Sequence, residues 1–82
     1  MKAKILVRLK STVHDPQGEA ILQSFHHMGY AQFTGVRQGK VFDLELQDLP
    51  HDKAWALLDE IARKVLANPV IEEYVIEMGE SE

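Results

Sequence analysis

The sequence predicts an α+β fold with the element order β-α-β-β-α-β, the ferredoxin-like arrangement, and three observations support this. Residues 2–10 alternate between apolar and polar positions, which is typical of a half-buried strand. Residues 54–66 carry apolar side chains at helical spacing instead. The two halves of the chain each follow the order strand, helix, strand. Right-handed crossovers in both halves would place two helices on one face of an antiparallel sheet.

The first half begins with a strand and a capped helix. In the strand Ile5 and Val7 face one way, whereas Leu6 and Arg8 face the other. Asp15-Pro16 starts the first helix, because the Asp side chain accepts from free helical N–H groups and Pro suits the first helical position. Its apolar stripe comprises Ile21, Phe25 and Met28, and Gly29 ends it.

The second half is predicted from a hairpin, a long helix and a last strand. Strands at 31–37 and 40–47 flank Gln38-Gly39, a pair that suits a tight turn. The second helix runs from about Pro50 to Asn68-Pro69. Its predicted inner face comprises Ala54, Leu57, Leu58, Ile61, Ala62, Val65 and Leu66. Residues 70–78 form the last strand, and 79–82 are expected to be a flexible tail of a single domain spanning 1–82.

The composition of the chain excludes several kinds of site and partner. The 82 residues include no Cys, which excludes disulfides, thiolate metal sites and cysteine nucleophiles. The net charge of −4 disfavours nucleic acid as a partner, because binding to phosphate depends on basic side chains. The charged N-terminal residues lead directly into an alternating strand, with no long apolar stretch. We therefore expect a cytoplasmic protein that interacts with no membrane.

The residues that could carry chemistry are not arranged as a site. His26 and His27 are neighbours on a helix and point about 100° apart, so they cannot chelate one ion together. The glycines form neither a dinucleotide-binding nor a P-loop pattern, and no Ser lies in a nucleophile elbow. We expect no catalytic residue, no bound metal and no cofactor in this chain.

One face of the predicted sheet suggests self-association. Leu6, Val41 and Val75 point away from the helices in the predicted register. Branched apolar residues beside Lys4 and Arg8 are unusual on a purely solvated face. Because a domain this small gains stability when such a face is covered, we expect a second copy or a protein partner there.

Four runs of residues carry a resemblance to one protein family. These runs lie at the entrance of the first helix, at its exit, across the hairpin and at the turn into the last strand. They are Asp15-Pro16-Gln17-Gly18, Gly29-Tyr30, Val36-Arg37-Gln38-Gly39-Lys40 and Leu66-Ala67-Asn68-Pro69-Val70-Ile71-Glu72-Glu73-Tyr74. Together these runs resemble the PurS family, the small subunits of phosphoribosylformylglycinamidine synthase. The resemblance covers essentially the whole chain. It departs at Leu49-Pro50-His51-Asp52, where the family often has a Ser and an acidic cluster.

The resemblance implies a non-catalytic assembly subunit with a variant of the ferredoxin-like fold. Such a subunit forms a dimer or tetramer, bridges the glutaminase subunit (PurQ) and the synthetase subunit (PurL), and supports ammonia transfer between them. ATP and magnesium would bind the large synthetase subunit, not this chain. The match in the hairpin run suggests Arg37, Gly39 and Lys40 as contacts with a partner. A dimeric domain that senses amino acids is the alternative, because it shares the topology.

Overall fold

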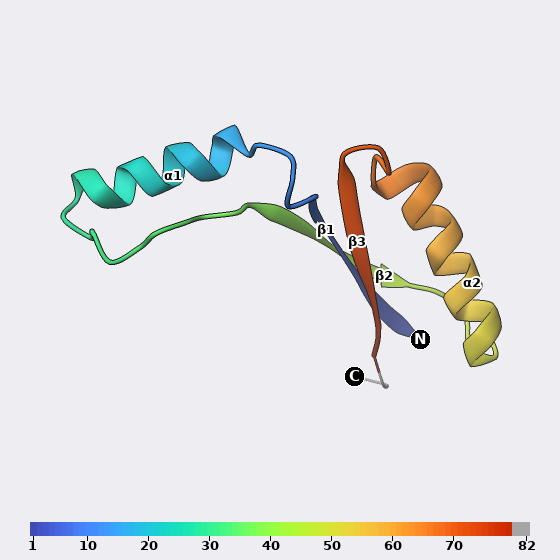
Figure 1. Cartoon of the computed structure of the whole chain (residues 1–82). Helices are drawn as coiled ribbons and strands as arrows, with labels where there is room; N and C mark the ends of the chain where they lie inside the picture. The colour runs from blue at the N-terminus through green and yellow to red at the C-terminus, as the bar shows by residue number, and fades with distance from the viewer. Residues whose placement is uncertain (80–82) are drawn as a thin grey trace.

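The structure, a computed structural model, describes residues 1–79 (Figure 1). Its elements alternate between strands and helices and end in a strand. They are β1 (Lys2–Leu9), α1 (Pro16–His27), β2 (Gly39–Glu45), α2 (His51–Ile61), the π-helix η1 (Ala62–Leu66) and β3 (Glu72–Met78). The predicted α+β class, with an antiparallel sheet and two α-helices, is confirmed.

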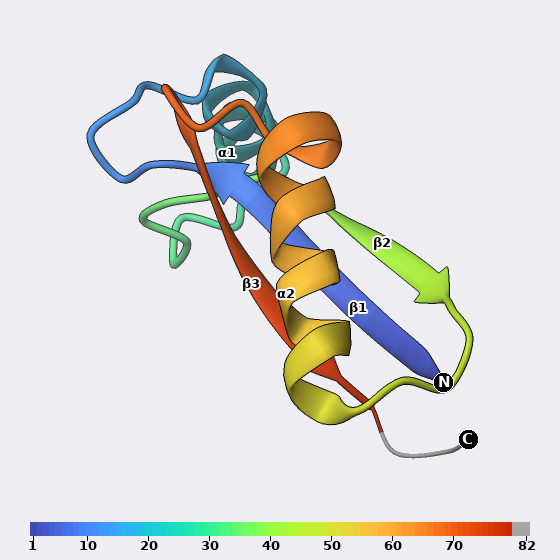
Figure 2. The same cartoon turned by 90° about the vertical axis from the view of Figure 1, so that its right-hand side faces the viewer.

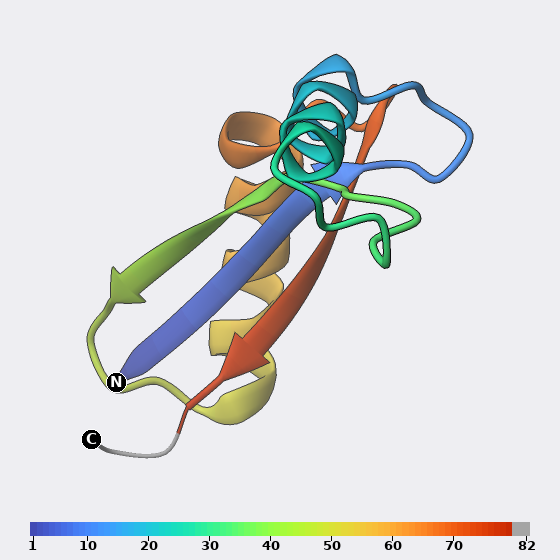
Figure 3. The same cartoon turned by 90° about the vertical axis from the view of Figure 1, so that its left-hand side faces the viewer.

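The sheet has three strands in the order β2-β1-β3, and β1 pairs antiparallel with both neighbours. Ile5 lies opposite Phe42 on β2 and Ile76 on β3. Figure 2 shows α2 crossing in front of β1 and β3, with β2 uncovered beside it. Figure 3 shows the other face, where no helix covers the length of the strands. We call this second surface the open face.

The core lies between β1 and α2. Because side chains alternate along a strand, every second residue of β1 points toward the helix, and α2 presents buried side chains one turn apart. The buried apolar residues are Ala3, Ile5, Val7, Ala54, Leu58, Ala62 and Ala67. Four of the seven are alanines, whose small side chains limit the apolar surface that the core removes from water.

The predicted strand at 31–37 is wrong. Residues 31–38 form no strand, and Gly39 is the first residue of β2 and not part of a hairpin turn. The only glycine with a positive φ in residues 1–79 is Gly29, at 94°. The physical reason lies at Gln38, whose backbone N–H donates to the Asp15 side chain at 2.8 Å. That bond holds residue 38 beside the start of α1, and the chain continues into β2 without reversing.

The expectation that both helices cover one face of the sheet is also wrong for a single chain. Figure 1 shows α1 and the following segment extending away from the sheet. The radius of gyration is 16.2 Å, whereas a compact domain of this length has about 12 Å. Among the elements of residues 1–79, α2 alone therefore covers the sheet.

The second helix departs from the predicted pattern near its end. The apolar pattern predicts Leu57 and Val65 on the inner face, but their side chains are 44% and 75% exposed. Val65 lies in the π-helix η1, which has more residues per turn than an α-helix and so shifts the phase of the side chains. Just after β3, Gly79 N–H donates to Lys2 O at 3.0 Å. The rest of the predicted flexible tail, 80–82, lies outside the described residues.

Candidate interaction surfaces

The open face carries an apolar row across all three strands. Leu6 lies opposite Val41 on β2 and Val75 on β3. Val41 is 55% exposed and Val75 is 54% exposed, and the row lines a shallow hollow of about 490 Å³. The structure thus brings together the three residues that the sequence suggested for self-association.

Charged pairs border this apolar row on both sides. On one side Lys4 Nζ lies 2.5 Å from Asp43 Oδ1, and on the other Arg8 Nε lies 2.9 Å from Glu73 Oε2. Both pairs are exposed, so each adds little to stability. An apolar strip between polar margins is the usual layout of a protein contact surface.

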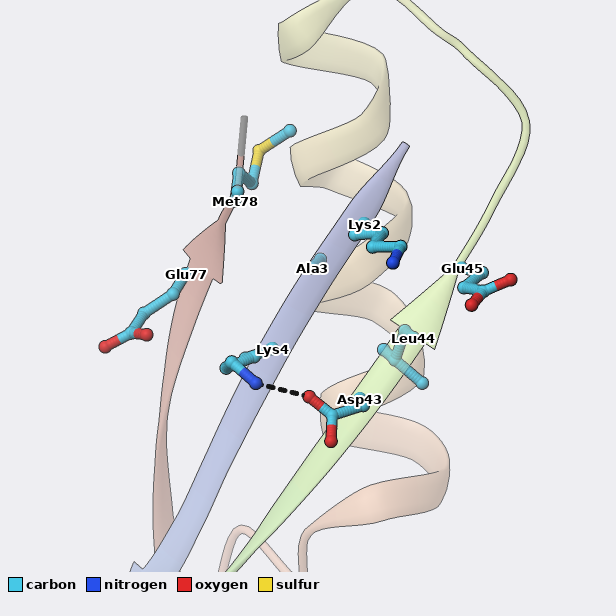
Figure 4. A pocket seen from close by; sticks show the side chains of 9 residues that line it. Lys2, Ala3, Lys4, Asp43, Leu44, Glu45, Glu77 and Met78 are labelled. Atoms are coloured by element: carbon cyan, nitrogen blue, oxygen red, sulfur yellow. Dashed lines mark hydrogen bonds and ion pairs between the residues drawn. The ribbon is translucent and has the colours of Figure 1, made fainter. Parts of the chain in front are cut away.

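A second hollow, of about 590 Å³, lies at the end of the sheet near the N-terminus (Figure 4). Lys4 points toward Asp43 there, whereas Lys2, Glu45 and Glu77 point apart. In residues 1–79 no three His, Cys, Asp or Glu side chains are placed to hold a metal ion. No helix in that range is both long and apolar enough to span a membrane.

Residues 16–38, which we call the arm, carry three exposed large apolar side chains. Met28, Tyr30 and Phe33 are 68%, 50% and 49% exposed. The arm is nevertheless ordered internally. The rings of Phe25 and Phe33 lie 4.9 Å apart, and His26 Nε2 is 2.8 Å from the Phe33 carbonyl oxygen. The arm is therefore a formed element, and residues 1–79 leave its Met28, Tyr30 and Phe33 side chains about half or more exposed.

Hydrogen bonds of Asp15 and Arg37 fix the base of the arm, and we call them the clasp. Asp15 Oδ1 accepts from Gly18 N–H at 3.0 Å and caps α1, while Oδ2 accepts from Gln38 N–H at 2.8 Å. Arg37 Nη2 donates to the carbonyls of Lys10 and Val13 at 2.8 and 2.9 Å. The clasp thus joins the entrance of the arm to its exit.

The Asp15 carboxylate is buried in the clasp and is stabilised there in its ionised form. Asp15 is the one buried polar or charged residue among those described, at 6% exposed. The Gln38 N–H, followed by the Gly18 N–H, lowers the pKa of Asp15 below its ordinary value. Gly18 is needed beside it, because a Cβ there would lie 2.3 Å from the Val36 carbonyl oxygen.

Arg37, Gly39 and Lys40, the three residues suggested for partner contact, differ in their surroundings. Arg37 is engaged in the clasp. Gly39 lies against β1, where an added Cβ would be 2.7 Å from the Val7 carbonyl oxygen. Lys40 is exposed, with Nζ 5.9 Å from the centre of the Phe42 ring. Contact with a partner stays a prediction for all three.

Two features of these surfaces are not predicted by the sequence patterns. One is the second hydrogen bond of Asp15, to Gln38 N–H. It lies in the clasp, where the runs at 15–18 and 36–40 meet. The other is an exposed apolar corner between α2 and β3, formed by Val65, Val70 and Ile71. Asn68 shapes this corner, since its side chain accepts from Val70 N–H at 3.1 Å.

These surfaces define a class of protein: a small α+β chain whose exposed apolar arm and open face suit it to bind other chains. Comparison with known proteins shows which family within this class the chain belongs to. The chain belongs to the PurS family, because the family model described as phosphoribosylformylglycinamidine (FGAM) synthase matches residues 2–80.

Relatives and solved structures agree with this assignment. The FGAM synthase subunit PurS of Bacillus subtilis is 40% identical over 79 residues, which are 96% of this chain and 93% of that protein. The crystal structure of Methanocaldococcus jannaschii PurS superposes with a TM-score of 0.89 at 30% identity, covering 99% of this chain and 98% of that one. A chain in the structure of PurLQS from Thermotoga maritima superposes with a TM-score of 0.84 at 32% identity, covering 94% and 95%.

Proposed function

We propose that this chain is the non-catalytic assembly subunit of FGAM synthase in purine biosynthesis, and that it bridges the glutaminase and the ATP-dependent synthetase subunits. The observation that carries the proposal is the uncovered arm, because apolar side chains this exposed need another chain to cover them. The similarity to a chain in the Thermotoga maritima PurLQS structure supports the choice of partners.

The proposal divides the chemistry among three kinds of chain. The glutaminase subunit, PurQ, releases ammonia, and the synthetase subunit, PurL, binds ATP and magnesium. This chain supports ammonia transfer by holding the two together in the cytoplasm. The relatives described above bear the name of FGAM synthase, and none supports the alternative of an amino-acid sensor.

Self-association is part of the proposal. The row of Leu6, Val41 and Val75 on the open face gives one surface for a second copy, and the arm gives another. Lys40 is the residue at the base of the arm best placed to contact a large subunit, since it is exposed and outside the clasp.

A pull-down tests the proposed bridging. The wild-type chain is expected to capture both PurQ and PurL, and Lys40→Glu is expected to capture less of one of them. Lys53→Glu, a charge reversal at an exposed position of α2, serves as the control and should capture both normally. Failure of the wild-type chain to capture either subunit would refute the bridging role. Normal capture by Lys40→Glu would refute only the assignment of Lys40.

A further inference from the structure

The acidic residues of the chain are concentrated in and after β3. Residues 72–82 contain five Glu and neither Lys nor Arg, whereas the other residues carry nine basic and eight acidic side chains. The net charge of −4 therefore comes from the segment that begins with β3. Such an asymmetry favours contact with a basic partner, because complementary charge steers association.

The backbone of β3 has a free edge on the side away from β1. The sheet has the order β2-β1-β3, so no strand of residues 1–79 lies beside this edge (Figure 3). Gly79 N–H donates to Lys2 O, so Gly79 directs its backbone groups toward β1. Because backbone groups alternate in direction along an antiparallel strand, those of Tyr74, Ile76 and Met78 face outward. These groups are able to pair with an added strand.

The side chains of β3 on the open face show which kind of strand would suit this edge. At alternate positions β3 exposes an acid, an apolar residue and a second acid, and β1 places a cation, an apolar residue and a second cation opposite them. The cross-strand pairs are Glu73 with Arg8, Val75 with Leu6 and Glu77 with Lys4. The inner edge of β3 is thus already paired with a strand of complementary charge.

A second copy of β3 does not suit the outer edge. β3 contains three Glu and neither Lys nor Arg, so two such strands side by side would place each acid opposite an acid or an uncharged residue. A strand with the pattern of β1 does suit it. Its two cations would lie beside Glu73 and Glu77, and its apolar residue would extend the row of Leu6, Val41 and Val75.

We propose that the outer edge of β3 binds an extended segment of one of the two partner subunits, PurQ or PurL. This segment has Lys or Arg at its first and fifth positions and an apolar residue at its third. It adds a strand to the sheet through the backbone of β3, and its cations pair with Glu73 and Glu77. The inference rests on the assembly role proposed above and names the chemistry of one contact.

A labelled synthetic peptide with the sequence of residues 2–10 tests the chemistry of the edge, because it contains the pattern of β1. Fluorescence anisotropy with the full-length chain should show saturable binding that weakens as salt is added. Glu73→Gln with Glu77→Gln should weaken binding by about 2- to 30-fold, the effect of losing two opposite-charge pairs between strands. Asp52→Asn with Glu60→Gln removes the same charge from exposed positions of α2 and should leave binding unchanged.

A substitution at the end of β3 tests the pairing of backbones. Met78→Pro removes an outward N–H without removing a bond to β1, whereas Met78→Ala shortens the side chain and keeps this N–H. In a pull-down Met78→Pro should capture less of PurQ or of PurL, and Met78→Ala should capture both normally. Circular dichroism checks that both variants are folded. If Met78→Pro does not fold, the double Gln variant gives the same comparison in the pull-down.

The outcomes separate this inference from the proposed function. A wild-type chain that captures neither PurQ nor PurL would refute the bridging role itself. Normal capture of both by the wild type and by the double Gln variant would refute the β3 contact and leave the bridging role standing. The β3 contact is also refuted if the peptide does not bind, or binds the double Gln variant equally well. Loss of one subunit alone from that variant supports the inference and shows which subunit supplies the segment.

Discussion

The hydroxyl of Tyr74 donates a hydrogen bond to Asp59 Oδ1 at 2.6 Å and so joins β3 to α2. Arg63 Nε lies 3.3 Å from the other carboxylate oxygen of Asp59. The Tyr74 hydroxyl is the main cause that lowers the pKa of Asp59, with Arg63 adding to it. The same hydrogen bond raises the pKa of Tyr74. The pair is therefore strongest with Asp59 ionised and Tyr74 protonated.

This pair predicts a loss of stability at both ends of the pH range. The pKa of Asp59 is lower in the folded chain than in the unfolded chain, so ionised Asp59 stabilises the fold. This contribution is complete above the pKa that Asp59 has in the unfolded chain, and it is lost as the pH falls below about 4. The raised pKa of Tyr74 gives stability that is lost in alkali, above about pH 10. Urea unfolding across this range should show both losses. Tyr74→Phe should flatten both, and an unchanged profile in that variant would contradict the assignment.

Leu58 is one of the three largest fully buried side chains of the small core. It is 1% exposed and packs against β1, so Leu58→Ala should lower the free energy of unfolding by about 2–5 kcal/mol. Because a small domain has only about 5–15 kcal/mol in total, this loss should lower the midpoint of urea unfolding clearly. Lys53→Ala, at an exposed position of the same helix, should change the midpoint of urea unfolding very little. Equal effects of the two substitutions would be contrary to the described core.

Gly18 and Gly35 differ in the space available for a side chain. A Cβ at Gly18 would lie 2.3 Å from the Val36 carbonyl oxygen, whereas nothing lies within 4 Å of a Cβ at Gly35. Gly18→Ala should destabilise the chain by about 1–3 kcal/mol through overpacking, even though alanine normally favours a helix over glycine. Gly35→Ala should leave thermal unfolding nearly unchanged. A stabilising effect of Gly18→Ala would show that the clasp is not closed as described.

The open face gives a prediction about assembly. Val75→Asp puts a charge in the apolar row beside Leu6 and should weaken the association that uses this face. Val70→Asp is the matched control at the α2–β3 corner, where the side chain is 77% exposed. Sedimentation of both variants over a range of concentrations measures the effect. Identical behaviour of Val75→Asp and the wild type would remove the open face from the proposed contacts.

The parts of the fold that depend on local pattern could be predicted from the sequence. The alternation around Ile5 and Val7 gives the buried face of β1, and Asp15-Pro16 gives the start of α1. The row of Leu6, Val41 and Val75 follows from the same alternation, once the strands pair in the observed register. These features depend on the period of a strand or on a cap, and neighbouring residues determine both.

The parts that depend on distant contacts could not be predicted in this way. Gln38-Gly39 has the composition of a turn, but a bond to Asp15, 23 residues earlier, keeps it in line with β2. The exposure of Val65 depends on a π-helix that no periodic pattern reveals. The position of α1 depends on the clasp and, in our proposal, on a second chain. A single sequence carries no direct signal for either.

The central claim is that this chain works by joining other chains and performs no chemistry alone. The most direct measurement is the glutamine-dependent synthesis of FGAM by PurQ and PurL of the same organism, with and without the chain. We predict that activity requires the chain and saturates as it is added. Full activity of PurQ and PurL in its absence, or turnover by the purified chain alone, would contradict the claim.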